Sequence, residues 1–342
     1  MFDIYPRDHY LQIRNSSMVY YSIADKDSLA PTKRSSGFGS TYTTLDQYDE
    51  NGEIIERTET ETYNGTVTKG AKKRISRAVD IMLQITPTIK LYNPIISKEV
   101  DFKLTFITLT LSDNTRFISA KECYQTCLKP FLDWLRRTKK CNTYIWKAER
   151  QKAKDKNGDL KLSRGQLHYH ITCNTFILHD ELRKKWNSLQ KEAGYLESFA
   201  TTYKHYNPNS TDIHSVYNIE NLEGYLIKYI SKEPEMLEGE SETEYKKRIT
   251  VDGKIWDCSS NLRGTKFFKI EYSDREHHLL NKGSNISNLR KLDIEHCTFY
   301  ACNSGTPSDY LSPNSWLDYC LYKSNLYYEQ ESVSEQEHSV ST

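Results

Sequence analysis

The chain has 342 residues, of which 37% are hydrophobic and 27% charged, and its formal net charge is +1. Its mean hydropathy of −0.74 and the lack of any run of about 18 apolar residues argue against a membrane-spanning protein. The N-terminus MFDIYPRDHY also lacks the basic and then apolar layout of a signal peptide. We therefore expect a protein of the cytoplasm, with no membrane partner and one elaborated domain or two small ones.

The small net charge hides a strong segregation of charge along the chain. Residues 129–164 contain twelve Lys or Arg against four Asp or Glu, whereas residues 46–61 contain seven acidic residues and one Arg. A charged run is often only a solvated surface, but basic clusters beside a candidate site favour a phosphate backbone as partner. The eight cysteines form no CxxC pair, which favours reduced thiols over a disulfide framework or a zinc ribbon.

Taken in chain order, the segments predict strands and helices in an alternating arrangement. Residues 1–68 are rich in Ser, Thr, Tyr and Asp with little periodicity, and they predict an irregular N-terminal arm. Pro130 is expected to bend or restart the helix that contains it. Alternation and 3.6-residue periodicity predict strands at 103–112, 142–151, 166–174, 211–219, 253–259 and 265–272, and helices at 119–140, 179–190, 221–232 and 315–329.

These elements indicate an α+β fold with a central antiparallel sheet flanked by helices. The strands 142–151 and 166–174 are joined by a polar loop and should pair as a hairpin. We expect a folded domain over residues 69–285, and a C-terminal extension over 286–342 that contains a helix and an acidic tail.

The stretch GQLHYHITCN at 165–174 places two histidines two residues apart in a predicted strand. Side chains at i and i+2 of a strand share a face, so His168 and His170 should project together and Tyr169 away from them. Two imidazoles and one acid suit a divalent ion, and Glu149 in the partner strand is the natural third ligand. A pair of half-exposed polar side chains on a sheet surface is the simpler alternative.

A second group of functional residues lies in NLEGYLIKYISK at 221–232. On a helix, Tyr225, Lys228, Tyr229 and Lys232 fall on one stripe, while the Leu and Ile residues occupy the other half. A phenol has a pKa near 10, so it attacks only when nearby cations or a metal-polarised target assist it. The stripe supplies cations and the histidine strand could supply the metal; a solvated amphipathic face remains the alternative.

These motifs resemble those of rolling-circle replication initiators (Rep) of the HUH endonuclease superfamily. The style is similar to the two-tyrosine initiators of microvirus-like single-stranded DNA phages and related plasmids. FITLTLS, LHYH and YLIKYISK appear in the expected order, and WKAERQ, STDIHSVYNIENLEGYL and KIWDCSSNL are also similar, so that the resemblance covers roughly residues 69–272. Tyr169 departs from the plainly hydrophobic residue usual between the histidines. The resemblance implies the HUH version of the ferredoxin-like or RRM-like fold.

The resemblance also implies roles for individual residues. His168, His170 and Glu149 would bind Mg or Mn, Tyr225 and Tyr229 would be nucleophiles, and Lys228 would stabilise charge beside them. One tyrosine would cut single-stranded DNA at an origin stem-loop and form a 5'-phosphotyrosine link. The other would act after one round of replication, so that a circle is released by ligation.

Basic residues outside these motifs are expected to contact the DNA backbone. A host polymerase would extend the free 3'-hydroxyl, and a host helicase would unwind the duplex, because the chain has no Walker A motif. The expected DNA contacts are Lys72, Lys73, Arg74, Arg77, Arg183, Lys184, Lys185 and Lys232.

Two other functions compete with the initiator interpretation. A rolling-circle transposase or a relaxase of a mobile element would use the same motifs, and the short chain argues against both. A non-catalytic origin-binding module would keep the basic clusters without the histidines and tyrosines. A purely structural role gives no reason for both motifs to occur together. His214 is interpreted as a strand residue rather than a ligand or a base contact.

Overall fold

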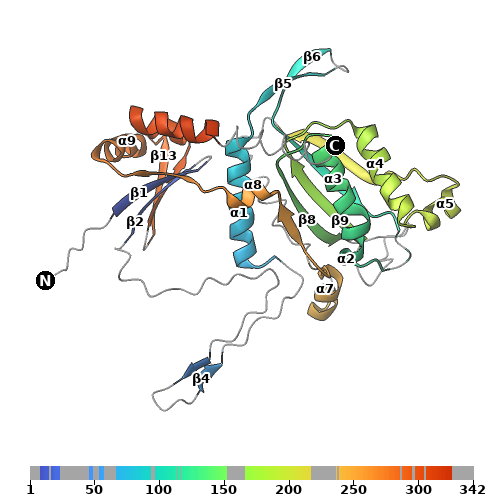
Figure 1. Ribbon diagram of the computed structural model, residues 1–342. Helices are drawn as coiled ribbons and strands as arrows, with labels where there is room; N and C mark the ends of the chain where they lie inside the picture. Colours follow the sequence, from blue (N-terminus) through green and yellow to red (C-terminus); the bar gives the residue numbers. More distant parts are fainter. Residues whose placement is uncertain are drawn as a thin grey trace, which may run out of the picture.

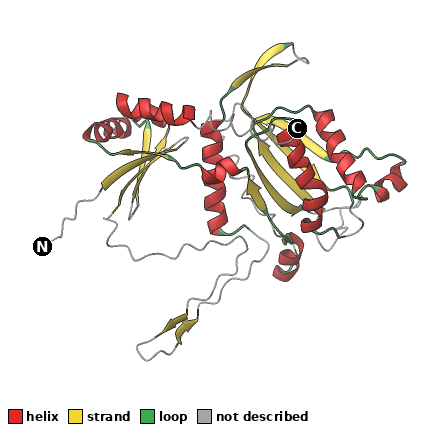
Figure 2. Cartoon of the chain, viewed as in Figure 1, coloured by secondary structure: helices red, strands yellow, loops and turns green. Residues whose placement is uncertain are grey.

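The structure is a computed structural model, which describes residues 8–14, 17–23, 46–48, 54–57, 67–93, 97–113, 115, 117–151, 166–216, 236, 239–285, 287–294, 297–303 and 306–325. These residues contain two five-stranded antiparallel sheets, two smaller hairpins and surrounding helices (Figures 1 and 2). The predicted α+β class with antiparallel sheets flanked by helices is confirmed. Among the described helices, none has the length and apolar character needed to cross a bilayer.

The central sheet has the strand order β10-β7-β9-β8-β11. The predicted hairpin is confirmed, because β8 and β9 pair antiparallel in a register that places Glu149 opposite His168. The register of β7 against β9 places Thr108 opposite His170 and Thr110 opposite His168. The strands are β7 (Leu104–Thr110), β8 (Tyr144–Gln151), β9 (Gln166–Cys173), β10 (Thr211–Val216) and β11 (Trp256–Cys258).

Helices cover the apolar face of the central sheet. Residues 120–137 form one helical run, in which the turn just before Pro130 is π-helical, as suits a residue that has no backbone N–H to donate. Trp186 packs edge-on against Tyr169 and Phe131, with ring centroids 6.3 and 5.9 Å apart. The helices are α2 (Ala120–Cys123), the π-helical turn η2 (Tyr124–Leu128), α3 (Lys129–Arg137) and α4 (His179–Glu192).

The N-terminal segment corrects a prediction from the sequence. Residues 8–23, predicted as part of an irregular arm, form two strands of a second sheet with the order β12-β1-β2-β14-β13. The pairing groups them with residues 268–302, across the domain boundaries set at 68 and 285. The strands are β1 (Asp8–Ile13), β2 (Ser17–Ile23), β12 (Phe268–Glu271), β13 (Leu289–Ile294) and β14 (Cys297–Cys302).

The second sheet has its own hydrophobic core. Leu11, Ile13 and Met18 are fully buried against residues of β12, β13 and β14 and of two helices. Those helices are α9 (Asp274–Asn285) and residues 313–325, where the sequence predicts a helix near 315–329. The alternation of apolar residues in β1 and β2 therefore serves a core whose other half lies more than 240 residues later in the chain.

Helix α1 (Lys69–Ile85) stands between the two sheets (Figure 1). Thr68 is its N-cap and accepts a hydrogen bond from the backbone N–H of Ala71 at 3.2 Å. Ile75, Val79 and Met82 of this helix are fully buried in the core of the central sheet. Helix α1 is thus the element through which the core of the central sheet continues toward the second sheet.

The remaining described elements lie around these two sheets. Helix α4 begins after Leu178 without a side-chain cap, so the capping signal predicted at His179 and Asp180 is wrong. The other elements are β3 (Asp46–Tyr48) with β4 (Ile54–Arg57), β5 (Ile89–Asn93) with β6 (Lys98–Phe102), α5 (Glu197–Tyr203), α7 (Glu242–Ile249), α8 (Ser260–Gly264) and the 3-10 turn η3 (Pro307–Tyr310).

Candidate active site

The histidine pair lies in the middle strand of the central sheet, as predicted. His168 and His170 share one face of β9, while Tyr169 points to the other face and is 1% exposed. There its ring packs against Trp146 and Trp186. Tyr169 is therefore a core residue, so a tyrosine between the two histidines leaves the histidine face unchanged.

Two threonines of β7 hold the imidazole rings in place. Thr108 Oγ1 lies 3.2 Å from His170 Nδ1, and Thr110 Oγ1 lies 3.1 Å from His168 Nδ1. Because each Nδ1 is engaged by a hydroxyl, each Nε2 is the nitrogen left for another partner. Sequence reasoning missed these threonines; the signal was the alternating TLT of the first strand motif, on the face that the histidines share.

Glu149 lies on the same face and contacts one of the histidines directly. Its Oε1 is 2.8 Å from His170 Nε2, and its side chain and that of His170 are only 12% and 11% exposed. Lys147, which is buried on the same strand, places its Nζ 3.4 Å from Glu149 Oε2, and Gln151 also donates a hydrogen bond to the carboxylate. Lys147 and Gln151 are site residues that the sequence did not predict.

The surroundings of these groups set their charge. Burial acts to raise the pKa of Glu149, but the hydrogen bond and charge of His170 and the charge of Lys147 outweigh it and lower the pKa to about 2. Burial, with a smaller effect from His170, lowers the pKa of His168 to about 4. At neutral pH the site therefore contains a carboxylate anion and a neutral His168 imidazole, which are the protonation states that a metal ion requires.

The donor set fits a divalent ion in type, although its side chains do not yet surround one. Two imidazoles and one carboxylate on one sheet face suit Mn or a similar ion, and the threonine hydroxyls are the kind of outer contact that orients metal-binding histidines. Within the part of the chain that the structure describes, no three His, Cys, Asp or Glu side chains converge as a closed metal site. Glu149 is instead engaged by His170, Lys147 and Gln151.

The predicted nucleophiles cannot be placed beside this site. Tyr225, Lys228, Tyr229 and Lys232 lie in residues 217–235, outside the described residues. The strand before them, β10, pairs with β7 and brings Asp212 opposite Thr108. His214 lies on the same strand opposite Phe106, with ring centroids 5.2 Å apart, which confirms it as a strand residue.

The predicted DNA contacts occupy two separate surfaces. Lys72, Lys73, Arg74 and Arg77 are exposed on α1. Arg183 and Lys184 line a groove of about 610 Å³ along α4, together with Lys191 and Tyr206, while Lys185 is half-buried. The Arg183 guanidinium donates to the carbonyl oxygens of Asn207 and Pro208, at 3.0 Å each, so its role in this structure is to hold the neighbouring loop.

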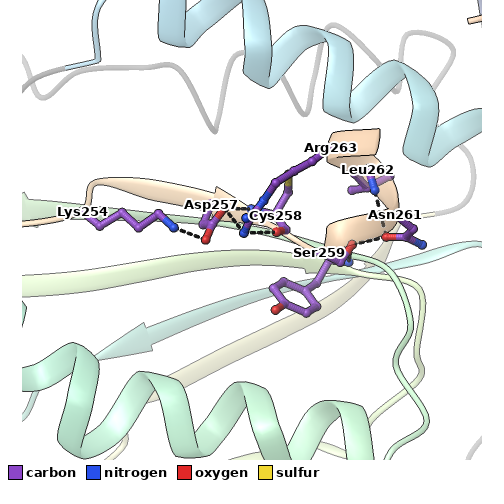
Figure 3. A network of polar contacts seen from close by, with 8 residues as sticks. Lys254, Asp257, Cys258, Ser259, Asn261, Leu262 and Arg263 are labelled. Carbon is purple, nitrogen blue, oxygen red and sulfur yellow. Dashed lines mark hydrogen bonds and ion pairs between the residues drawn. The ribbon is translucent and has the colours of Figure 1, made fainter. Parts of the chain in front are cut away.

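The stretch KIWDCSSNL closes the β11 edge of the central sheet. Asp257 binds Lys254 and lies 2.7 Å from Arg263, and Ser259 donates to Asn261 at 2.6 Å (Figure 3). Asn261 in turn donates to the hydroxyl of Thr143, just before β8, at 3.0 Å. These contacts anchor β11 beside β8, the strand that carries Glu149, and so support the site from outside it.

Comparison with known proteins places a match over the site itself. Residues 104–234 match a family described as replication-associated protein, of the ORF2 type. No curated protein and no solved structure matches the chain. The matched segment begins at the first residue of β7 and contains Glu149, both histidines and both predicted tyrosines. Over this segment the chain is thus similar to a family of replication-associated proteins.

Proposed function

We propose that this protein is a rolling-circle replication initiator that nicks and rejoins single-stranded DNA at an origin. The observation that carries the proposal is the arrangement of His168, His170 and Glu149 on one sheet face, with threonines fixing both rings. That arrangement lies inside the segment similar to replication-associated proteins, which also contains the tyrosine motif. The two-tyrosine HUH type and the phage or plasmid relationship are parts of this proposal.

The proposed reaction is a transesterification at a DNA phosphate. A divalent ion held by His168, His170 and Glu149, Mg or Mn, would supply polarisation of a phosphate oxygen. The phenol oxygen of Tyr225 or Tyr229 forms a bond to phosphorus, the bond from phosphorus to the 3' oxygen breaks, and the proton lost by the phenol is balanced by the one gained at the 3'-hydroxyl. The product is a 5'-phosphotyrosine link.

Rejoining is the reverse of the same step. A 3'-hydroxyl attacks the phosphotyrosine, the bond from phosphorus to the phenol oxygen breaks, and an intact strand is restored. Two tyrosines one helical turn apart allow the second to cut the regenerated origin while the first still carries the strand. Lys228 would lower the cost of a phenolate beside it, because an adjacent cation favours the anionic form. Host polymerase and helicase would complete the replication cycle.

The first test is the covalent adduct. The protein is incubated with Mn and labelled stem-loop oligonucleotides and analysed on a denaturing gel. A shifted band is expected, and it should disappear when both tyrosines are changed, Tyr225→Phe with Tyr229→Phe, while single-strand binding persists. Tyr92→Phe is the matched control, because Tyr92 is an exposed tyrosine of the β5–β6 hairpin. An adduct that survives in the double variant would remove these tyrosines as nucleophiles.

The metal assignment has a separate test. His168→Ala and His170→Ala should each abolish metal-stimulated cleavage and weaken Mn binding measured by calorimetry. Undiminished stimulation by Mn in either variant would remove that histidine as a ligand. If no adduct forms with any oligonucleotide although binding is measurable, the chain is a non-catalytic origin-binding module. A transposase or relaxase would be recognised by the genes carried on the native replicon.

A further inference from the structure

The exposed side of α1 carries a basic stripe that the proposed nicking chemistry does not use. At 100° per residue, Lys73, Arg74 and Arg77 lie opposite the side that buries Ile75 and Val79. Lys73, Arg74 and Arg77 have no ion pair with any carboxylate in the described part of the chain. Three positive charges are therefore presented to solvent along the first half of the helix.

The stripe continues onto the second sheet through one aromatic ring. The guanidinium carbons of Arg77 and of Arg14 lie 5.5 and 5.3 Å from the centre of the Phe267 ring. Arg77 also donates from Nη2 to the carbonyl oxygen of Thr265 at 2.8 Å. Arg14 follows β1, and its backbone N–H donates to Ser17 in the turn before β2. Stacking on one ring therefore brings two arginines from distant segments to one place and fixes their orientation.

Further basic side chains extend this surface over the second sheet. Lys269 pairs with Gln12 across β12 and β1, on the face opposite the one that buries Leu11. Lys266 is exposed just before this strand. Glu271 is the exposed acid on the same face of β12, two residues beyond Lys269. Positive charge therefore dominates the part of the face nearest α1.

We propose that this surface, formed by Arg14, Lys73, Arg74, Arg77, Lys266 and Lys269, binds the phosphate backbone of duplex DNA. Lysine and arginine side chains that neutralise phosphates supply sequence-independent affinity by releasing counterions. Proteins that prefer single strands offer exposed rings on which bases stack. The ring at the centre of this surface, Phe267, is half-buried and already stacked by two guanidiniums. The surface therefore suits a backbone whose bases are paired, such as the stem or the parental duplex beside an origin.

The test measures binding of a labelled duplex to the full chain as salt is varied, in the presence of a chelator so that no cleavage occurs. The triple variant Lys73→Gln, Arg74→Gln, Lys269→Gln leaves the stacked arginines in place. Each lost phosphate contact should reduce the salt slope of log K by about 0.9, so the triple variant should lose roughly 2 to 3 from the slope. Its affinity should fall by a similar factor for unrelated duplex sequences.

The matched control removes the same charge elsewhere. Lys98→Gln, Arg275→Gln, Lys282→Gln changes three exposed residues of β6 and α9 and should leave the slope near that of the native protein. An equal loss in both triple variants, or an unchanged slope in the first, would overturn the proposal. So would a loss of single-strand binding as large as the loss of duplex binding. Because covalent adduct formation on single strands is measured separately, failure of the nicking proposal would not be confused with failure of this one.

Discussion

His170 Nε2 lies 2.8 Å from Glu149 Oε1, which joins an imidazole of β9 to a carboxylate of β8 across 21 residues of sequence. The antiparallel register brings the two side chains to one face of the sheet, and β7 supplies the hydroxyl that holds the other side of each ring. The strands thus position three potential ligands and their outer contacts without help from any loop. Rigid strands hold such groups more accurately than loops do.

Thr110→Val should weaken metal binding. Valine keeps the volume of threonine but removes the hydroxyl that lies 3.1 Å from His168 Nδ1, so the ring loses the contact that orients it. Loss of such an outer contact typically costs about 10- to 100-fold in metal affinity. Calorimetric titration with Mn measures the change. Thr105→Val is the control, since Thr105 lies on the other face of β7 and donates to the carbonyl of Thr175. Equal Mn affinity in the Thr110 variant and the native protein would contradict the orienting role.

Glu276→Gln should destabilise the second sheet. The Glu276 carboxylate is 1% exposed and accepts hydrogen bonds from Ser312 N at 3.0 Å and Ser315 Oγ at 2.9 Å, which tie α9 to the helix at 313–325. Hydrogen bonds to a charged group contribute about 1.5 to 3 kcal/mol. We expect a loss of that order in the free energy of unfolding at pH 7, measured by urea denaturation.

The same substitution should alter how stability depends on pH. Burial acts to raise the pKa of Glu276, but hydrogen bonds from Ser312 and Ser315 outweigh it and hold the pKa below its ordinary value of 4.5. A carboxyl group with a lowered pKa stabilises the folded state above that ordinary value, and the contribution is lost as pH falls through the lowered pKa. The difference between native and Glu276→Gln should therefore narrow below pH 4.5. A difference that stays constant down to pH 3 would argue against an ionised Glu276.

Gly283→Ala should destabilise the protein, although alanine is the better helix former. A Cβ at Gly283 would lie 2.5 Å from the Tyr310 ring and 2.8 Å from Leu289 Cδ1, so α9 would have to move away from β13. Overpacking of this kind costs about 1 to 3 kcal/mol, against about 1 kcal/mol gained from helix propensity. Gly70→Ala is the control, because its nearest atom is Arg74 Nη1 at 3.6 Å. Thermal unfolding should separate the two variants, and a stabilised Gly283 variant would show that the contact relaxes freely.

Removal of residues 1–23 should unfold the second sheet. The deletion takes away β1 and β2, leaves β12 and β14 without those partners, and removes Leu11, Ile13 and Met18 from the core. Full burial of each such side chain contributes about 1.5 to 3 kcal/mol. Hydrogen exchange should lose protection in β12, β13, β14 and α9, while β7, β8 and β9 stay protected. Unchanged protection in the shortened chain would mean that the N-terminal strands are dispensable, as the interpretation of an irregular arm implies.

The candidate site could be predicted from the sequence where one short segment carried the information. Alternation in the LHYH strand placed His168 and His170 on one face, and the polar loop before it indicated the hairpin that brings Glu149 beside them. The roles of Thr108 and Thr110 could not be predicted in this way. They depend on the register between β7 and β9, whose paired residues are about 60 positions apart.

The second sheet was beyond prediction for the same physical reason. Leu11, Ile13 and Met18 are apolar residues in a polar segment, and their partners, such as Ile270 and Tyr300, lie at the other end of the chain. Local periodicity reports which side of a strand is apolar, but it carries no information about which distant strand covers that side.

The sequence by itself determined the α+β class, the central hairpin and the shared face of the two histidines, because these follow from residue spacing within short segments. Tertiary structure alone decided that the two ends of the chain form one sheet and that Arg14 and Arg77 stack on the same ring. It also decided that threonines orient the histidines. Each of these depends on the pairing and packing of segments distant in sequence, which is settled only when the whole chain buries its apolar surface.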